Sequence, residues 1–326
     1  MKEFTITKND AGQRLDRWLG KAVPLLPAPL AQKYIRLKRV KVNGKGAQRD
    51  YRLNVGDLLQ LYINDEFFDS PTEDNAFLSV FRPELDIVYE DEHMMVCDKR
   101  PGLLCHPDQG EYVNTLITHI QAYLYQKKEW SPRWENSFTP ALCNRIDRNT
   151  GGLVIAAKSA EALRILNDKI RDREISKLYL AAVVGKMTPP SGELKGFLLK
   201  DEKKNQVSVY QKPVPGGKTA ITRYRTLQAK NGLSLVECEL LTGRTHQIRA
   251  QFAHAGHPLL GDGKYGRRAD NAKAGQKGQA LWSYKLVFDF PTDAGILEYL
   301  RGRTLEVPPE GIGFVGEYFG KALVLR

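Results

Sequence analysis

The chain has 326 residues, 42% of them hydrophobic and 27% charged, a composition typical of a folded globular protein with room for two domains. It contains no apolar run of about 18 residues, which argues against a transmembrane helix, and its polar N-terminus lacks the apolar core of a signal peptide, so we expect a cytoplasmic protein. The formal net charge of +11 favours a polyanionic partner, although it is also compatible with solubility alone.

The first 64 residues have the pattern of a small module of helices and strands. Apolar residues at helical spacing predict a helix over 13–23, and a second short helix is expected over 27–40. The segment 40–63 then predicts short strands, with Asn43-Gly44 as a hairpin turn. We therefore expect two helices followed by a small sheet.

Charge is distributed unevenly along this part of the chain. Residues 33–52 hold eight Lys or Arg and a single acid, whereas residues 65–74 hold five acids and no base. The basic segment indicates a nucleic-acid-binding surface, with a plain solvated face as the alternative. The acidic, turn-rich segment 65–80 is the best candidate for a linker.

From about residue 81 the pattern changes to strands that alternate with helices. Residues 85–99 predict two strands joined by a turn at 90–92, and the short apolar run 153–158 predicts another strand. Ser159 is suited to cap a following helix. The segment 177–185 is apolar on both faces, as expected of a central strand.

The last third of the chain continues the mixed pattern. Residues 218–227 and 234–241 predict adjacent antiparallel strands, and 245–256 predict a helix that ends at Gly256. The basic, aromatic-free segment 267–279 predicts a mobile loop. The fold class is therefore α+β, with a mixed, mainly antiparallel sheet flanked by helices.

The segment "CNRIDRNTGGLVIAAKS" places Asp147 between two arginines, just before a Gly-Gly turn and an apolar strand. A nearby guanidinium favours the ionised form of a carboxylate, and an ionised, partly desolvated carboxylate can act on an electrophilic carbon such as the anomeric carbon of a sugar. Ordinary glycoside hydrolysis needs a second carboxylate, which the neighbouring residues do not supply. From these residues alone, a structural ion pair remains the alternative.

The sequence offers little sign of a metal or organic cofactor. His246, His254 and His257 lack an acidic partner at the usual i, i+4 spacing, and "GDGKYG" lacks the strand and helix that flank a dinucleotide-binding loop. The cysteines form no C-x-x-C pair and lie in apolar contexts, so we expect buried, reduced thiols. They are Cys97, Cys105, Cys143 and Cys238.

The N-terminal segments "RLDRWL", "IRLKRVKVNGK" and "LNVGDLL" resemble the S4-type RNA-binding domain found in a ribosomal protein and in many RNA-modifying enzymes. In that family the second helix and the loop after it meet the RNA backbone, where cations position the protein without reading the base sequence. The resemblance covers about residues 13–63. It assigns RNA binding to Lys33, Arg36, Lys38, Arg39, Lys41 and Lys45.

The rest of the chain resembles the RluA-type RNA pseudouridine synthases, and in particular their RluC/RluD-like members. "NRIDRNTGGL" is similar to their catalytic motif H-R-L-D-x-x-T-S-G-L, "ISKLYLAAVVG" to the motif around a tyrosine, and "LLTGRTHQIRAQFAHAGHPLLGDGKYG" to the third motif. "DKRPGLLCHP" fits the segment before the catalytic motif. The motifs keep the order of the family and cover most of residues 85–286.

This resemblance implies an enzyme that isomerises uridine to pseudouridine within RNA without a metal or organic cofactor. It gives Asp147 the role of the essential aspartate, by direct addition or by a glycal-forming route, and Arg145 that of helping to flip the target nucleotide. Tyr179 is implied to pack on the base and to take part in proton removal. Arg244 is implied to pair with Asp147, so these two side chains are expected within salt-bridge distance and close to Tyr179.

The sequence departs from the family motif at two positions. Asn144 stands where a histidine is usual, and Gly151 where a serine is usual. Neither is an acting residue of the family, so the departures bear on subfamily and substrate and leave the reaction type unaffected.

The resemblance implies an S4-like domain over 1–64, a linker over 65–80 and a catalytic domain over 81–326. Large-subunit ribosomal RNA is the expected substrate and transfer RNA the alternative, with the protein acting as a monomer. A non-enzymatic RNA-binding or ribosome-assembly protein on the same fold, and a nucleoside glycosidase, are the competing functions.

Overall fold

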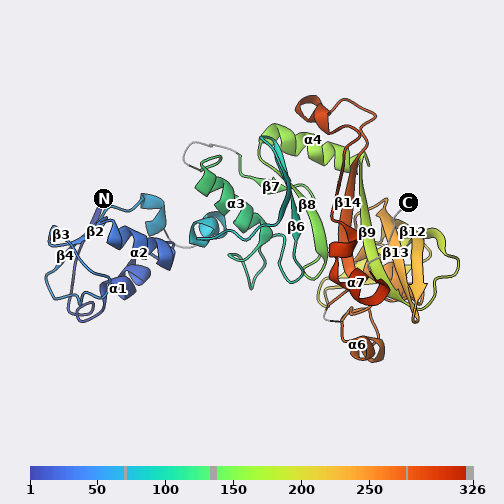
Figure 1. The fold of residues 1–326 in the computed structure, drawn as a ribbon, viewed down its shortest axis with the longest axis horizontal. Helices are drawn as coiled ribbons and strands as arrows, with labels where there is room; N and C mark the ends of the chain where they lie inside the picture. Colours follow the sequence, from blue (N-terminus) through green and yellow to red (C-terminus); the bar gives the residue numbers. More distant parts are fainter. Residues whose placement is uncertain (70–71, 133–137, 277, 321–326) are drawn as a thin grey trace. The chain divides into compact units, whose positions relative to one another are not determined.

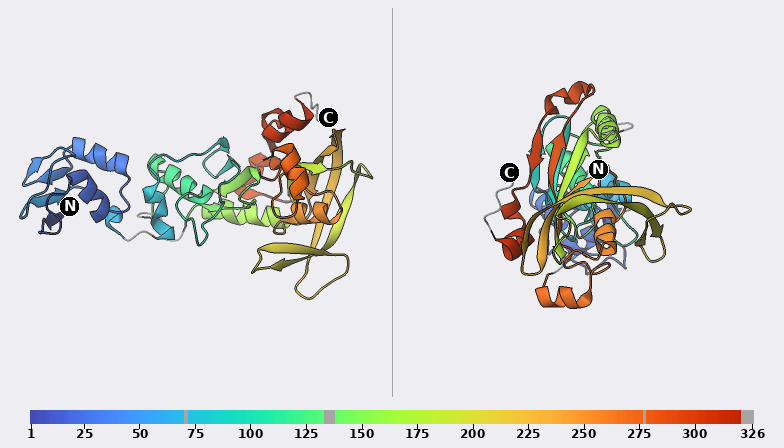
Figure 2. Two further views of the ribbon diagram at one scale, coloured as in Figure 1. Left: turned by 90° about the horizontal axis from the view of Figure 1, so that it is seen from below. Right: turned by 90° about the vertical axis from the view of Figure 1, so that its right-hand side faces the viewer.

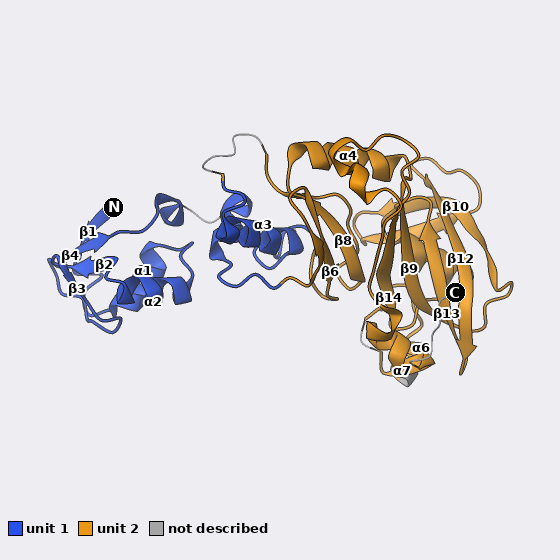
Figure 3. Cartoon of the chain, turned by 45° about the horizontal axis from the view of Figure 1, so that its top comes forward, with its two compact units in different colours: residues 1–84, 106–131 blue, residues 85–105, 132–326 orange. Residues whose placement is uncertain are grey.

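The computed structural model describes residues 1–69, 72–132, 138–276 and 278–320, and the chain runs through it as shown in Figure 1. It divides into two compact units, which Figure 3 distinguishes by colour. Unit 1 comprises residues 1–84 and 106–131, and unit 2 comprises residues 85–105 and 132–326. No helix among the described residues is long and apolar enough to cross a membrane.

Unit 1 begins with the two helices and the small sheet that the sequence predicts. The sheet has four strands in the order β1-β4-β2-β3. Asn43 and Gly44 both have positive φ values, of 50° and 78°, so they form the expected tight hairpin turn between β2 and β3. The elements are β1 (Lys2–Thr5), α1 (Leu15–Ala22), α2 (Ala28–Arg36), β2 (Val40–Val42), β3 (Lys45–Gly46) and β4 (Leu58–Leu61).

The remainder of unit 1 contains short helices in the segment predicted to be a linker. The segment expected to be a linker, whose residues 70–71 lie outside the described ones, contains the short 3-10 helices η1 (Asp65–Phe68) and η2 (Glu73–Ser79). Helix η2 packs against α3 (Leu116–Lys127), where the buried ring of Phe77 lies 5.3 Å from that of Tyr125. This aromatic packing places the segment up to residue 84 in one unit with 106–131.

Unit 2 is built on an 11-stranded sheet with the order β11-β10-β12-β13-β9-β14-β8-β6-β5, to which β7 and β15 pair at the side. Figure 2 shows how strongly its strands twist along its length. The β14–β8 pair is parallel and the other described pairs are antiparallel. The mixed, mainly antiparallel α+β fold is therefore confirmed.

Unit 2 contains the predicted strands and helices together with elements that the sequence did not predict. The strands are β5 (Ile87–Glu90), β6 (Met94–Lys99), β7 (Ala141–Leu142), β8 (Gly151–Ala157), β9 (Ile175–Val184), β10 (Ser191–Asp201), β11 (Gln206–Tyr210), β12 (Lys218–Lys230), β13 (Leu233–Leu240), β14 (Leu281–Phe288) and β15 (Thr304–Glu306). The helices are α4 (Ala160–Arg171), α5 (Gln247–His254), α6 (Arg268–Ala274), η3 (Gly295–Leu300), η4 (Pro309–Gly311) and α7 (Gly313–Phe319).

Strand β9 lies in the middle of the sheet and is buried on both faces, as its continuous apolar sequence predicts. Leu180 and Ala182 pack into a core cluster with side chains of α7. Successive side chains of a strand point to opposite faces, so the odd-numbered residues point away from that cluster. Tyr179 belongs to this second face, which carries the site described below.

Two local predictions are wrong. Gly151 and Gly152 belong to strand β8 and do not form a turn. Both positions need glycine, because a Cβ on Gly151 would lie 2.3 Å from the ring of Trp282 and one on Gly152 would meet the backbone of Ser283. The predicted mobile loop 267–279, whose residue 277 lies outside the described ones, contains helix α6. That helix ends at Gly275, whose left-handed conformation is the usual helix stop.

Candidate active site

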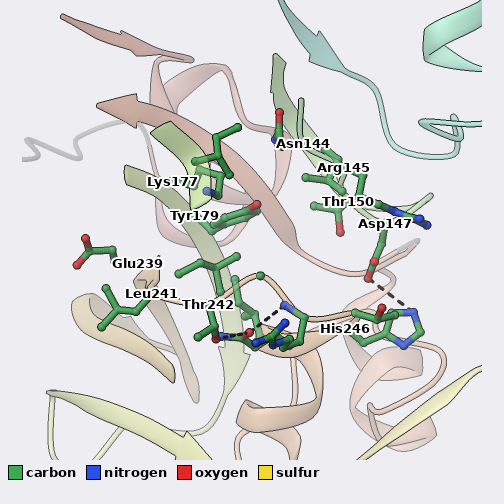
Figure 4. A pocket seen from close by; sticks show the side chains of 18 of the residues that line it. Asn144, Arg145, Asp147, Thr150, Lys177, Tyr179, Glu239, Leu241, Thr242 and His246 are labelled. Carbon is green, nitrogen blue, oxygen red and sulfur yellow. Dashed lines mark hydrogen bonds and ion pairs between the residues drawn. The ribbon is translucent and has the colours of Figure 1, made fainter. Parts of the chain in front are cut away.

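A pocket of about 600 Å³ opens on the face of β9 that carries Tyr179. Three stretches of unit 2 line most of it: the residues between β7 and β8, the start of β9, and the segment that leads from β13 into α5. Figure 4 shows side chains of all three stretches around the pocket, including Asp147, Tyr179 and His246. The fold thus brings together residues about one hundred positions apart in the sequence.

Asp147 lies in the loop before β8 with about a quarter (26%) of its side chain exposed. The buried ammonium group of Lys99 holds the backbone of this loop. The Nζ of Lys99 donates hydrogen bonds to the carbonyl oxygens of Arg100, Leu103 and Arg148, at 3.0, 2.8 and 3.0 Å. Burial lowers the pKa of Lys99 to about 8. The loop that carries the carboxylate is therefore anchored to Lys99 at Arg148, the residue after Asp147.

The direct partner of Asp147 is Arg249 in helix α5. Nη1 of Arg249 donates to Oδ2 of Asp147 at 2.7 Å. The same guanidinium donates from Nε and Nη2 to the two carboxylate oxygens of Asp262, at 2.7 and 3.0 Å. Asp262 is fully buried, yet its interactions with Arg249 outweigh burial and lower its pKa. Arg249 is thus oriented by a buried carboxylate and presents its Nη1 to Asp147.

The predicted pairing of Asp147 with Arg244 is wrong. Arg244 lines the pocket but is exposed, and its Nε donates to the carbonyl oxygen of Thr219 at 3.1 Å. It lies in the turn before α5, whereas Arg249 lies on the helix itself, at i+3 from His246. Residues at this spacing share one helix face, and here that face is turned toward Asp147.

His246 is a further neighbour of Asp147 that the sequence analysis did not select. Its Nε2 lies 3.8 Å from Oδ2 of Asp147, and its Nδ1 lies 2.9 Å from the hydroxyl of Tyr265. Burial lowers the pKa of His246 to about 4. Its backbone has a φ of 53°, a left-handed conformation that few residues other than glycine adopt. This residue directly precedes α5, and its imidazole lines the pocket.

Tyr179 lies on the wall of the same pocket, with only 5% of the residue exposed. Burial raises the pKa of its phenol, a hydrogen bond with Ser283 opposes the rise, and the charge of Asp147 adds to it. The hydroxyl is therefore neutral at pH 7. Lys177, two positions earlier on β9, also lines the pocket, and burial lowers its pKa.

The remaining predicted residues of the catalytic motif occupy distinct places. Arg145 is exposed at the pocket. Asn144, at the position where the motif usually has histidine, accepts a hydrogen bond from the backbone N–H of Ile155 at 2.8 Å. This bond fastens the loop that carries Asp147 to β8. Asn144 therefore has a structural contact that accounts for a polar residue at this position.

The predicted RNA-binding residues all belong to unit 1, at the end of α2 and in the β2–β3 hairpin. Five of them are exposed and Lys41 is half-buried. Two cations lie over aromatic rings: Arg39 over Tyr34 at 5.2 Å and Lys41 over Tyr62 at 5.1 Å. The six are Lys33, Arg36, Lys38, Arg39, Lys41 and Lys45.

Comparison with known proteins accounts for both units. The sequence matches the family model of RNA pseudouridylate synthase over residues 93–254 and that of the S4 domain over residues 13–59. It is 32% identical to the ribosomal large subunit pseudouridine synthase C of Vibrio parahaemolyticus, over 84% of this chain and 82% of that protein. The chain belongs to the RNA pseudouridine synthase family.

Other members of the family are similar over comparable lengths. The synthase is 32% identical to the ribosomal large subunit pseudouridine synthase D of Neisseria meningitidis, over 88% of this chain and 75% of that protein. Human RNA pseudouridylate synthase domain containing 1 has the same fold, with a TM-score of 0.52 at 21% identity over 69% of this chain and 82% of the human one. The protein is thus an RNA pseudouridine synthase with an S4 RNA-binding domain.

Three functional candidates of this synthase escaped sequence reasoning: Arg249, His246 and Asp262. The first two stand in the same motif, "GRTHQIR", from which Arg244 was selected. Their spacing of three on a predicted helix was the available signal, since it places both on one face. Asp262 lies in "GDGKYG", and nothing in its sequence context indicates a buried partner for an arginine 13 positions earlier.

Proposed function

We propose that this synthase converts one or more uridines of large-subunit ribosomal RNA to pseudouridine, with Asp147 as the group that acts on the sugar and without a metal or organic cofactor. The observation that carries the proposal is the position of Asp147. It is a partly exposed carboxylate at a pocket, and its partner Arg249 is itself fixed by the buried Asp262. A surface ion pair has no reason to be supported in this way.

The chemistry needs no external reagent, because uridine and pseudouridine are isomers. The bond from C1′ of the ribose to N1 of uracil breaks, a bond from C1′ to C5 forms, the proton on C5 leaves and a proton is bound at N1. The carboxylate of Asp147 acts at the sugar during this exchange, either by adding to C1′ or by assisting elimination. The half-enclosed pocket retains the detached base until the new bond forms.

The other pocket residues have roles that follow from their exposure and charge. Arg145 is exposed and cationic, suited to entering the RNA stack as the target nucleotide flips out. Tyr179 is buried and neutral, and it offers its ring face to the uracil. Arg244 is exposed at the rim, and we assign to it a contact with RNA in place of the pairing with Asp147.

The RNA class is inferred from the relatives and from unit 1. Two relatives of about one third identity are named ribosomal large subunit pseudouridine synthases. The six cations of unit 1 suit phosphate contacts, which position a protein on RNA without reading its sequence. We propose further that the synthase acts as a monomer.

The proposal is tested by mapping pseudouridines in total RNA from cells that lack the gene. Complementation uses the parent protein, Asp147→Asn, and Asp168→Asn as a matched control on the exposed ion pair of α4. We expect at least one pseudouridine of large-subunit ribosomal RNA to disappear in the deletion. The parent and the control should restore it, and Asp147→Asn should not.

Three outcomes would change the assignment. Loss of a pseudouridine confined to transfer RNA would show that the RNA class is wrong. Restoration by Asp147→Asn to the level of the parent would remove the aspartate from the chemistry. If no pseudouridine changes while ribosome assembly is impaired, the protein acts in these cells as a non-enzymatic RNA-binding factor.

A further inference from the structure

We propose that His246 is a positioning residue that faces Asp147 as a neutral hydrogen-bond donor, with its proton fixed on Nε2 by Tyr265. The proposal rests on the role of Asp147 given above. It assigns a role to the second neighbour of Asp147, His246, besides its direct partner Arg249. Figure 4 shows the ring of His246 beside the carboxylate of Asp147 at the pocket.

The hydrogen bonds of Tyr265 determine which nitrogen of His246 carries the proton. The hydroxyl oxygen of Tyr265 accepts the backbone N–H of Val207 at 2.8 Å and lies 2.9 Å from Nδ1 of His246. A phenol has one hydrogen to donate. If Nδ1 were also protonated, the oxygen would receive two donors and its own hydrogen would lack this acceptor. The arrangement that satisfies all three groups has Tyr265 donating to Nδ1, which leaves the proton on Nε2.

The charges around His246 support the neutral form. Burial disfavours the imidazolium, and the cations Arg249 of α5 and Lys264 act in the same direction. Asp147 and Asp262 oppose them, but the balance lowers the pKa of His246 to about 4. At pH 7 the ring is therefore neutral, and its Nε2 lies 3.8 Å from Oδ2 of Asp147.

A neutral donor has a specific advantage at this place. Arg249 already contributes one positive charge, which it shares between Asp147 and Asp262. A second cation would hold the carboxylate more tightly and make it a poorer nucleophile, whereas a neutral N–H orients it with less loss of reactivity. The 3.8 Å separation is longer than a hydrogen bond. Catalytic contacts of this kind often shorten only when substrate binds.

The tautomer can be measured directly on the full-length protein labelled with ¹⁵N at histidine. Two-bond ¹H–¹⁵N correlations separate the Nε2–H, Nδ1–H and doubly protonated rings, and the signal missing from His246→Gln assigns this residue among the six histidines. We expect an Nε2–H ring that does not titrate between pH 8 and about pH 5. An Nδ1–H ring, or a ring that titrates near its ordinary value of about 6.5, would overturn the proposal.

Tyr265→Phe tests the cause of the tautomer. The variant removes the hydroxyl group that donates to Nδ1 of His246 and keeps the aromatic ring that packs beside it. We expect a mixture of the two neutral tautomers in the labelled variant and a lower kcat. A ring that remains entirely Nε2–H would show that Tyr265 does not fix the proton.

Two substitutions separate the donor from the scaffold. The side-chain amide of His246→Gln reaches the Nε2 position and can still donate to Asp147, whereas that of His246→Asn reaches only the Nδ1 position near Tyr265. We expect kcat to fall about 10- to 100-fold in the Asn variant, the effect of losing a hydrogen bond to a charged group, with KM little changed. The Gln variant should retain most of the activity.

The outcomes also separate this proposal from the proposed function. If His246→Asn folds, by its melting temperature, and turns over like the parent, the positioning role is refuted even though Asp147 remains catalytic. If Asp147→Asn is fully active, the proposed function fails, while the tautomer measured by NMR is unaffected. Should the Asn variant not fold, the tautomer of the parent and the activity of the Gln variant decide the matter.

Discussion

Asp262→Asn tests whether the buried carboxylate holds Arg249, the partner of Asp147, in place. The substitution keeps the size of the side chain and removes its charge. The oxygen that replaces Oδ1 can still accept the backbone N–H groups of Lys264 and Tyr265, which lie 2.8 and 3.1 Å from Oδ1 in the parent structure. The new NH₂ group, however, faces Nε of Arg249, which now donates to Asp262 at 2.7 Å. Two donors would therefore meet at a site where only 8% of the arginine side chain is exposed.

Removing one partner of a buried ion pair costs about 3–5 kcal/mol, and we take about 3 kcal/mol because the amide retains some hydrogen bonds. For a domain of about 200 residues, each kcal/mol shifts the melting temperature by about 2–4 °C. Asp262→Asn should thus lower the melting temperature by about 6–12 °C, measured by calorimetry at pH 7. Asp168→Asn, which breaks an exposed ion pair on α4, should leave it almost unchanged.

The pH dependence gives a second readout with a definite sign. The folded-state pKa of Asp262 is lowered, so its contribution to stability is present above the unfolded carboxyl value of about 4 and is lost as the pH falls through the folded value. The difference between parent and Asp262→Asn should be constant from pH 7 to about pH 5 and should narrow below about pH 4. An Asp262→Asn protein that melts within about 1 °C of the parent at pH 7 would refute the reasoning.

The remaining predictions concern other parts of the synthase. Gly151→Ala should lower the melting temperature, because its Cβ would lie 2.3 Å from an indole ring, whereas Gly316→Ala on α7, with open space around it, should not; calorimetry compares them. Lys38→Ala combined with Arg39→Ala should weaken RNA binding and reduce the dependence of the binding constant on salt concentration. An unchanged salt dependence in a binding titration would show that these two cations do not contact RNA. Lys177→Met should raise KM for RNA several-fold without lowering the melting temperature, since it removes a desolvated ammonium from the pocket wall; a parental KM would contradict this.

Local sequence signals were sufficient to predict several elements of the fold, whereas others, such as α3, β10 and β14, were not predicted. The apolar run of β9 predicted a central strand because burial on both faces leaves few polar positions. Ser159 predicted the start of α4 because its side chain can accept the N–H of Ala162, at 3.2 Å in the structure. Such signals lie within a few residues of the element they specify, so a single sequence is enough to read them.

The predictions that failed depended on distant residues. Gly151 and Gly152 suggested a turn, but their role is to let Trp282 and Ser283 of the neighbouring strand approach closely. Segment 267–279 suggested a loop from its charge and glycines, although its alanines and the stop at Gly275 permit a short helix. The position of Trp282 and its strand β14 beside these glycines cannot be inferred from the local sequence.

The candidate site shows the same limit. The motif identified Asp147 and Tyr179, and the structure places both at one pocket. Which arginine of "GRTHQIR" pairs with Asp147 could not be decided from the motif, because the answer depends on where α5 begins and on Asp262. Arg249 pairs with Asp147 because α5 turns it toward this residue and because the buried Asp262 holds it in place.

The most direct test of the account is tritium release from RNA that carries [5-³H]uridine, since the C5 proton must leave when C5 bonds to the sugar. With ribosomal RNA from cells that lack the gene, the parent synthase should release tritium and incorporate pseudouridine in equal amounts. Asp147→Asn should bind the same RNA with similar affinity and release none above background. Tritium release by Asp147→Asn at the rate of the parent would contradict the central claim that this carboxylate performs the reaction.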